Sequence, residues 1–163
     1  MVSGWMESPS GHPARLLHFG MTDSKGRQLT LTFGTDMNAT DGFDTSLGEV
    51  PIPPPPPPGN FDLRFVDRPG VHRVPGDGSY VDFRGFHSRS QVDTFIVRFQ
   101  VPNDAYPVRF FWDPVGKTFC DSMFVEFASL HGIERLDMST RTMLTLHESD
   151  QTTLRIKKYG ARK

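Results

Sequence analysis

Hydrophobic and polar residues alternate along much of this 163-residue chain, and the alternation restricts the fold more than any other feature. Successive side chains of a β-strand point to opposite faces, so a period of two gives one buried and one solvated face. Between Gln28 and Phe33, for example, leucine and phenylalanine alternate with threonine. Strands are likewise predicted at Leu16–Met21, Phe61–Phe65, Phe95–Phe99, Val108–Trp112, Met123–Phe127, Met143–His147 and Leu154–Lys158.

Turn-forming residues separate the predicted strands. The segment Asp23–Gly26 is typical of a hairpin turn between the first two strands. No window of about 11 residues has a helical period, and only Glu126–Arg135, which contains Gly132, leaves room for one helical turn. We therefore predict an all-β fold, an antiparallel β-sandwich of immunoglobulin-like or jelly-roll-like type with roughly eight to ten short strands. A barrel is the second choice.

The composition agrees with a phenylalanine core and excludes several classes of function. The chain has 14 Phe against 3 Tyr and 2 Trp, so phenylalanine is the main aromatic residue available to fill a core. A net charge of −1 gives no bulk attraction to nucleic acid or to anionic lipid. Cys120 is the single cysteine, so no internal disulfide can form, and no apolar run approaches the ~18 residues of a membrane span. We expect neither a nucleic-acid partner nor membrane insertion.

Residues 51–58, PIPPPPPP, form the one low-complexity segment. Its six consecutive prolines adopt polyproline II, which makes a stiff rod of roughly 19 Å. Proline has no backbone N–H, so the run cannot lie inside a sheet. Two interpretations are open: a ligand for a proline-reading domain, and a rigid crossover between sheets or along one edge. The second is favoured because strand-like sequence resumes at Phe61.

We divide the chain into an extended N-terminal arm at 1–14, a single sandwich domain at 15–158 and a basic tail at 159–163. The arm lacks the basic start and the apolar stretch of a secretory signal. Its prolines favour an extended arm, held by its own domain or by a neighbouring molecule. The basic residues from Arg155 onward are typical of a solvated terminus.

A family resemblance centres on the segment Leu31–Phe65. Its elements are Phe33-Gly34, the sequence ATDGFD at 39–44, the proline run, and Phe61 with Phe65. In this order they resemble a domain that recurs in secreted proteins of Bacteroidetes, Chlorobi and their relatives, often just ahead of a type IX secretion sorting domain. The later half of the chain follows the same order of strands more loosely. The resemblance implies an extracellular or cell-surface β-sandwich, although this chain shows neither a signal peptide nor a sorting domain.

The loop after the second predicted strand is the strongest candidate site. Oxygen-bearing side chains at alternate positions before a glycine suit Ca²⁺, which binds six to eight oxygens. The candidate ligands are Asp36, Asn38, Thr40, Asp41 and Asp44. The spacing departs from the EF-hand pattern, because Asp41 stands where that pattern requires glycine. The alternative is that these side chains cap their own backbone in an ordered loop, with no cofactor.

The sequence carries no arrangement of residues typical of an active site. The six histidines lack the paired spacing of metal ligands. A Gly-x-Ser-x-Gly elbow, a phosphate-binding loop and paired carboxylates in a recognisable frame are all absent from the sequence. Cys120 follows Phe119 in an apolar stretch, which favours a buried, inert thiol. We predict that the protein is not an enzyme.

The favoured function is structural: a self-assembling subunit of a surface filament, sheath or tube, whose partner is another copy of the chain. The low net charge offers little long-range repulsion against packing. An extended arm can add a strand to the edge of a neighbour's sheet through backbone hydrogen bonds. The candidate contact residues are Trp5, Met6, Leu16, Leu17 and Phe19.

The alternative function is a carbohydrate-binding or adhesion module with a polysaccharide partner. Sugar rings stack on exposed aromatic side chains while neighbouring polar groups bind hydroxyls. The candidate residues are Tyr80, Tyr106, Arg109, Phe111, Trp112 and Asp113. Packing in the core is the competing interpretation of these aromatic residues. A third alternative is an accessory module of a larger enzyme complex, with no activity of its own.

Overall fold

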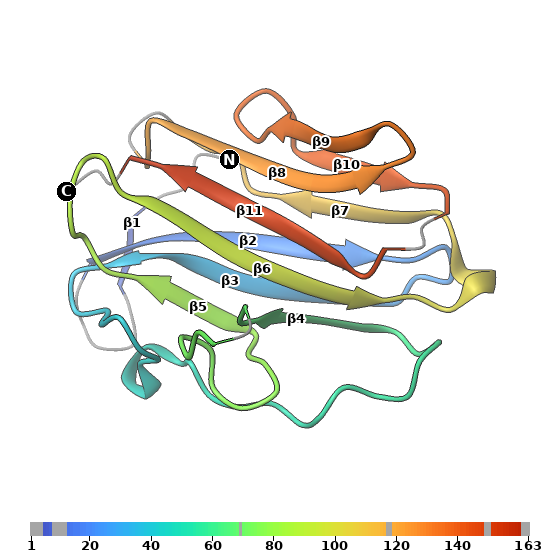
Figure 1. Cartoon of the computed structure of the whole chain (residues 1–163), viewed down its shortest axis with the longest axis horizontal. Helices are drawn as coiled ribbons and strands as arrows, with labels where there is room; N and C mark the ends of the chain where they lie inside the picture. The colour runs from blue at the N-terminus through green and yellow to red at the C-terminus, as the bar shows by residue number, and fades with distance from the viewer. Residues whose placement is uncertain (1–4, 8–12, 69, 117–118, 149–150, 161–163) are drawn as a thin grey trace.

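A computed structural model of the chain describes residues 5–7, 13–68, 70–116, 119–148 and 151–160, with the backbone alone described at 5–7, 13 and 14. Two sheets face each other, and the predicted all-β sandwich is confirmed (Figure 1). Two short 3-10 turns, η1 (Thr45–Leu47) and η2 (Asn103–Ala105), interrupt the loops. Within the described residues, no helix has the length and apolar character needed to cross a membrane.

Sheet A has the strand order β10-β7-β2-β3-β5, and β1 pairs with the beginning of β2. Its pairs are antiparallel, apart from the parallel pair of β3 with β5. The strands of sheet A are β1 (Trp5–Glu7), β2 (Pro13–Thr22), β3 (Gln28–Asp36), β5 (Val81–Arg84), β7 (Val108–Trp112) and β10 (Met143–Leu146).

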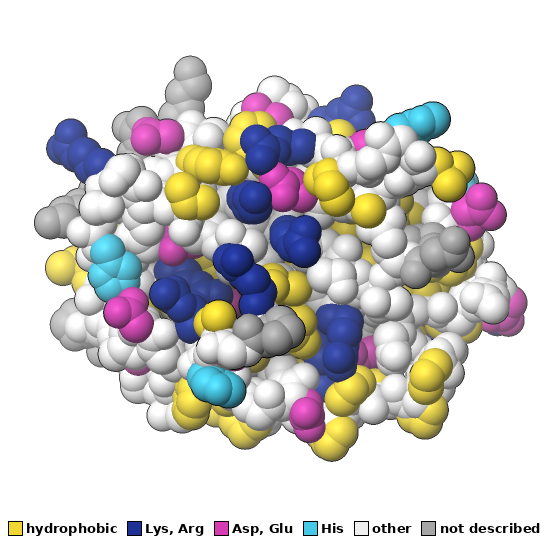
Figure 2. Space-filling model, in the orientation of Figure 1, with side chains coloured by type: hydrophobic (Ala, Val, Ile, Leu, Met, Phe, Trp, Pro, Cys, Tyr) yellow, Lys and Arg dark blue, Asp and Glu magenta, His cyan; other side chains and the backbone are white. Residues whose placement is uncertain are grey.

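Sheet B has the strand order β4-β6-β11-β8-β9, and all of its pairs are antiparallel. The strands of sheet B are β4 (Asp62–Val66), β6 (Val92–Gln100), β8 (Ser122–Ser129), β9 (Gly132–Asp137) and β11 (Thr153–Tyr159). Sheet B faces the viewer in Figure 1. Figure 2 shows Lys and Arg side chains gathered on this face, over β6 and β11.

Every strand predicted from the alternation overlaps an observed strand, and the structure adds β1, β5 and β9. The helical turn considered for Glu126–Arg135 is wrong, because this segment is the hairpin of β8 and β9. The solvated terminus expected from Arg155 onward is wrong for its first residues, which form β11. Lys158 faces the interior of the sandwich, where its Nζ donates to Asp93 Oδ2 at 2.7 Å.

The core between the sheets consists mainly of phenylalanine, as the composition predicts. Phe33 of sheet A and Phe95 of sheet B meet edge to face, with ring centroids 5.1 Å apart. Phe19 stacks on Trp112 with centroids 5.8 Å apart. Aromatic side chains bury about 150–250 Å² each, so these rings supply much of the hydrophobic stabilisation that holds the sheets together.

The proline run carries the chain from sheet A to sheet B along the lower margin of the sandwich (Figure 1). Arg64 Nη1 donates to the Pro53 carbonyl at 2.8 Å, and Gln100 Nε2 donates to the Pro56 carbonyl at 3.1 Å. Positions three apart share one face of a polyproline II helix, so a single face of the run docks on sheet B. The position of the run agrees with the interpretation as a crossover between sheets.

Candidate functional site

The lower edge of the sandwich, formed by β4 and β5, is closed by other parts of the chain. Phe65 and Ser79 exchange two backbone hydrogen bonds of 2.8 and 3.2 Å, so the residues just before β5 pair with β4. The Glu49 carboxylate accepts the backbone N–H groups of Phe83 and Asp44. The carboxylate thereby accepts a hydrogen bond from β5 that a neighbouring strand would otherwise accept. Burial raises the pKa of Glu49 to about 7, and the two N–H groups oppose this increase.

A buried ion pair strengthens the closure of the lower edge beside the proline run. Arg64 Nε and Nη2 donate to the two carboxylate oxygens of Asp62 at 2.7 and 2.8 Å. This hydrogen-bonded carboxylate raises the pKa of the Arg64 guanidinium further. Arg64 Nη1 also donates to the carbonyls of Pro53 and Asp77 at 2.8 and 3.3 Å. One guanidinium therefore connects β4, the proline run and the segment before β5.

The upper edge, formed by β9 and β10, has no comparable cover in the described part of the chain (Figure 1). Large apolar side chains are exposed here: Leu130 at 100 %, Ile133 at 64 % and Met143 at 51 %. The two edge strands differ in charge, because β9 carries Glu134 and Arg135 whereas β10, with the sequence MLTL, carries neither charge nor proline. Charges and prolines are the usual means of protecting an edge strand, so β10 is the unprotected one.

The register of β10 identifies the backbone groups that face outward. Trp112 donates its N–H to the Thr142 carbonyl at 3.0 Å where the pair of β7 and β10 begins. Hydrogen-bonded positions alternate in an antiparallel pair, so the N–H and C=O groups of Met143 and Thr145 point away from β7. No described strand pairs with this side of β10. The Leu144 side chain, between them, is buried in the core.

The predicted calcium loop folds as a set of local backbone caps. Asp36 Oδ1 accepts the Asn38 N–H at 2.8 Å, and Asp44 Oδ2 accepts the Thr40 N–H at 2.8 Å. Asp41 Oδ1 lies 2.8 Å from a ring nitrogen of a histidine in the loop between β5 and β6. Among the described residues, no three acidic, histidine or cysteine side chains form a group suited to a metal ion. These contacts are the ones expected of capping, and the calcium site stays a prediction.

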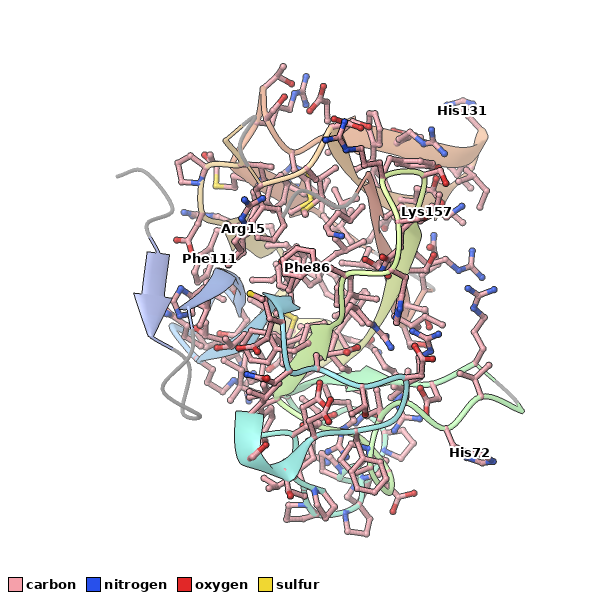
Figure 3. All side chains as sticks on the ribbon, turned by 90° about the vertical axis from the view of Figure 1, so that its left-hand side faces the viewer. Arg15, His72, Phe86, Phe111, His131 and Lys157 are labelled. Atoms are coloured by element: carbon pink, nitrogen blue, oxygen red, sulfur yellow. The ribbon has the colours of Figure 1, made fainter. Side chains whose placement is uncertain are left out.

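Trp112, the central residue of the predicted carbohydrate site, is buried in the core. Strand β7 alternates, so Trp112 faces the core with Phe110 and is 5 % exposed. Its Nε1 donates to the Arg141 carbonyl at 2.6 Å. Phe111 lies instead on the outer face of sheet A, directly over Gly20, on the opposite side of the sandwich from Lys157 (Figure 3). The prediction of Trp112 as an exposed stacking residue is therefore wrong, and core packing is its role.

The other carbohydrate candidates are spread over several parts of the molecule. Arg109 is exposed on β7, and Tyr106 packs against the core. Asp113 Oδ2 accepts the backbone N–H of His18 at 2.8 Å and lies 2.9 Å from its Nδ1. Tyr80 is 38 % exposed and precedes β5 at the lower edge. The structure brings no stacking platform together from these residues.

The predicted assembly residues belong in part to the fold of the chain itself. Trp5 and Met6 lie in β1, whose backbone pairs with β2 of the same chain, and their side chains lie outside the described residues. Leu17 and Phe19 are fully buried, because alternation along β2 turns both toward sheet B. Their prediction as contacts with a neighbour is wrong. Leu16 faces the other way and packs against a small apolar cluster on the outer face of sheet A.

Sequence reasoning did not find the open upper edge. Met143 falls within a predicted strand, but periodicity does not reveal which strand ends a sheet. The available signal was the absence of charge from 143–146, which is informative only once β10 is known to be an edge. Leu130 and Ile133 lie in the hairpin that was considered as a helical turn, so their exposure could not be inferred.

No family model, no curated protein and no solved structure matches the chain. Function is therefore inferred from the geometry of the chain itself.

Proposed function

We propose that this protein is a non-catalytic structural domain that associates with further copies of itself through the edge strand β10. The observation that carries the proposal is the contrast between the two edges. Glu49, Arg64 and the proline run cover the lower edge, while at the upper edge Met143 and Thr145 direct backbone groups outward that pair with no strand in the described part of the chain. Proteins that stay single protect such edges with charge, proline or cover, and β10 has no charge and no proline.

A second copy of the chain is the partner that suits β10. Antiparallel pairing about a two-fold axis at Leu144 places Met143 of one copy opposite Thr145 of the other. Both residues direct their N–H and C=O groups outward, so each such pair exchanges two backbone hydrogen bonds. Because β10 is uncharged, this self-pairing brings no like charges together. Sheet A would then continue from one copy into the next.

Growth beyond a pair requires a second contact, because a two-fold interface closes after two copies. Leu130 and Ile133 supply an exposed apolar surface for it at the hairpin of β8 and β9. Repetition of the two contacts would give a filament, a sheath or a tube. The sequence resemblance to secreted domains supports a location outside the cell or at its surface.

The decisive variant removes the outward N–H of Thr145. Thr145→Pro deletes a donor that β7 does not use, so the edge of a single chain accommodates it. Thr145→Val keeps the N–H and serves as the matched control. In sedimentation velocity over a concentration series, we expect dimers or larger species for wild type and Thr145→Val, and monomers for Thr145→Pro with an unchanged circular dichroism spectrum. A wild type that stays monomeric, or a proline variant that associates like it, contradicts the proposal.

A further inference from the structure

A cavity of about 370 Å³ opens between the start of β6 and the loop that joins β4 to β5. This volume lies within the range of pockets that bind small molecules. The lining combines apolar side chains, such as Val71 and Ile96, with charged ones. The charged residues of the lining, histidine apart, are Asp67, Arg68, Arg73, Arg84 and Asp93. The cavity does not include any residue of the β10 edge, and it adjoins the predicted calcium loop, because the lining residue His87 lies 2.8 Å from Asp41.

Both carboxylates of the lining are occupied by groups of the chain itself. Asp67 Oδ2 accepts the backbone N–H groups of Arg73 and Val74 at 2.8 and 2.9 Å. Asp93 Oδ2 accepts the buried Lys158 ammonium at 2.7 Å, and its Oδ1 accepts an N–H of the Gln91 amide at 2.7 Å. The charge of Asp93 is thus balanced by Lys158, and Asp67 is held in place by two backbone N–H groups.

The arginines of the lining keep donors to spare. Arg84 is 5 % exposed, and its guanidinium lies over the Phe95 ring, 5.1 Å from the centroid. Arg84 Nη2 donates to Asp82 Oδ2 at 2.8 Å, while Nε is buried without a hydrogen-bond partner. Within the described residues, Arg68 and Arg73 form no ion pair. Three guanidinium groups therefore line one cavity with their charge only partly compensated.

We propose that this cavity binds the phosphate or sulfate group of a small organic ester. Planar guanidinium groups match the oxygens of such anions with paired, charge-assisted hydrogen bonds. Arg84 is held rigidly at the cavity wall by its ion pair and by the Phe95 ring, and Arg68 and Arg73 approach from the adjoining loop. The cavity is much larger than a single inorganic anion, so the apolar part of the lining accommodates the organic portion of the ligand.

Phenyl phosphate and phenyl sulfate are suitable probes, with phenol and inorganic phosphate as controls for the two halves of the ligand. Isothermal titration calorimetry at low and at physiological salt measures their binding to wild type, Arg73→Gln, Arg68→Gln and Arg109→Gln. The first two variants each remove a cation from the lining. The third removes an exposed cation of sheet A that lies outside it. Arg84 is left in place because its removal would leave Asp82 buried without its partner.

We expect saturable binding of at least one ester by the wild type. Binding should be about tenfold weaker in Arg73→Gln and in Arg68→Gln and unchanged in Arg109→Gln. The ester that binds more tightly identifies the anionic group. An absence of saturable binding by either ester in wild type would overturn the proposal. Equal affinity in wild type, Arg73→Gln and Arg68→Gln would also overturn the proposal, provided that the melting temperatures of the two variants show intact folds.

Discussion

At the lower edge of the sandwich the chain covers its own end strands, whereas at the upper edge none of the described residues pairs with the outer side of β10. Ser79 pairs with β4, Glu49 accepts an N–H of β5, and the proline run docks on Arg64. Strand β10 directs backbone groups of Met143 and Thr145 outward, where no described strand pairs with them, and it has no charge to repel another strand. Both edges belong to the same pair of sheets, so the difference does not follow from the architecture.

The comparison shows what protection of an edge requires in this fold. Most of the cover comes from segments outside β4 and β5, and it depends on two buried ionisable side chains: Glu49, which precedes β4, and Arg64, which lies on β4 itself. Buried charge is costly to desolvate, and it is stabilising only while its partners are in place. This contrast is the basis of our proposal that copies of the chain associate at the upper edge.

The largest expected effect comes from breaking the closed edge. Arg64→Ala would leave the Asp62 carboxylate buried without its partner and would release the proline run. We expect the free energy of unfolding in urea to fall by about 3–5 kcal/mol. Arg98→Ala is the matched control, because Arg98 lies opposite Arg64 on β6 but is less buried. Similar losses in the two variants would show that Arg64 does not hold the edge together.

A smaller effect is expected from pH at the same edge. The pKa of Glu49 is about 7 in the folded protein against an ordinary value of 4.5, so the folded state retains a proton that the unfolded chain loses between these values. Stability must therefore decrease as the pH rises through this window. The ionisable groups that act on Glu49 include Asp44, Arg84 and the buried Asp82.

The difference between wild type and Glu49→Gln isolates this contribution, because glutamine does not titrate. We expect the melting temperature of wild type to fall by roughly 5–10 °C more than that of the variant between pH 5 and pH 8. Differential scanning calorimetry provides the measurement. Parallel curves for the two proteins would mean that Glu49 does not hold a proton in the folded state.

The smallest effect on stability is expected at the open edge. Met143→Lys adds an exposed charge to β10 without removing a core side chain, so the free energy of unfolding should change by less than about 0.5 kcal/mol. Association should weaken by about tenfold, because the new charge must be desolvated in the paired edge. The lysines of the two copies also repel each other across the paired edge, and added salt should restore part of the affinity by screening this repulsion. An unchanged affinity would place the contact elsewhere.

Local sequence was sufficient for the sandwich and the crossover, because both depend on alternation and on the backbone chemistry of proline. It was insufficient for β5, where the inward positions are the charged Asp82 and Arg84 and the outward Phe83 is covered by a loop. The usual relation between polarity and exposure is inverted in this strand. Strand β9 was missed for a related reason, since an edge strand that carries Glu134 and Arg135 lacks an apolar face.

The candidate sites were harder to predict than the strands. Trp112 was a candidate for stacking because sugar rings stack on aromatic side chains, but it lies two residues from Phe110 on β7 and therefore faces the core with it. The importance of Met143 and Thr145 depends on the order of strands in sheet A, which is set by contacts between distant segments. The arginine-lined cavity likewise draws its charged residues from β5, β6 and the loop before β5. Such groupings cannot be read from periodicity alone.

Disulfide trapping between copies tests the central claim most directly. In the proposed pair Met143 faces Thr145 of the other copy as a hydrogen-bonded pair, whose Cα atoms are about 5.5 Å apart and within the range that a disulfide spans. Met143→Cys and Thr145→Cys are prepared separately, with the native Cys120 left buried in both. An equimolar mixture under mild oxidation should give a cross-linked dimer, and either variant alone should give little, because like positions are offset by two residues. No cross-link in the mixture, or equal cross-linking in each variant alone, would contradict association through β10.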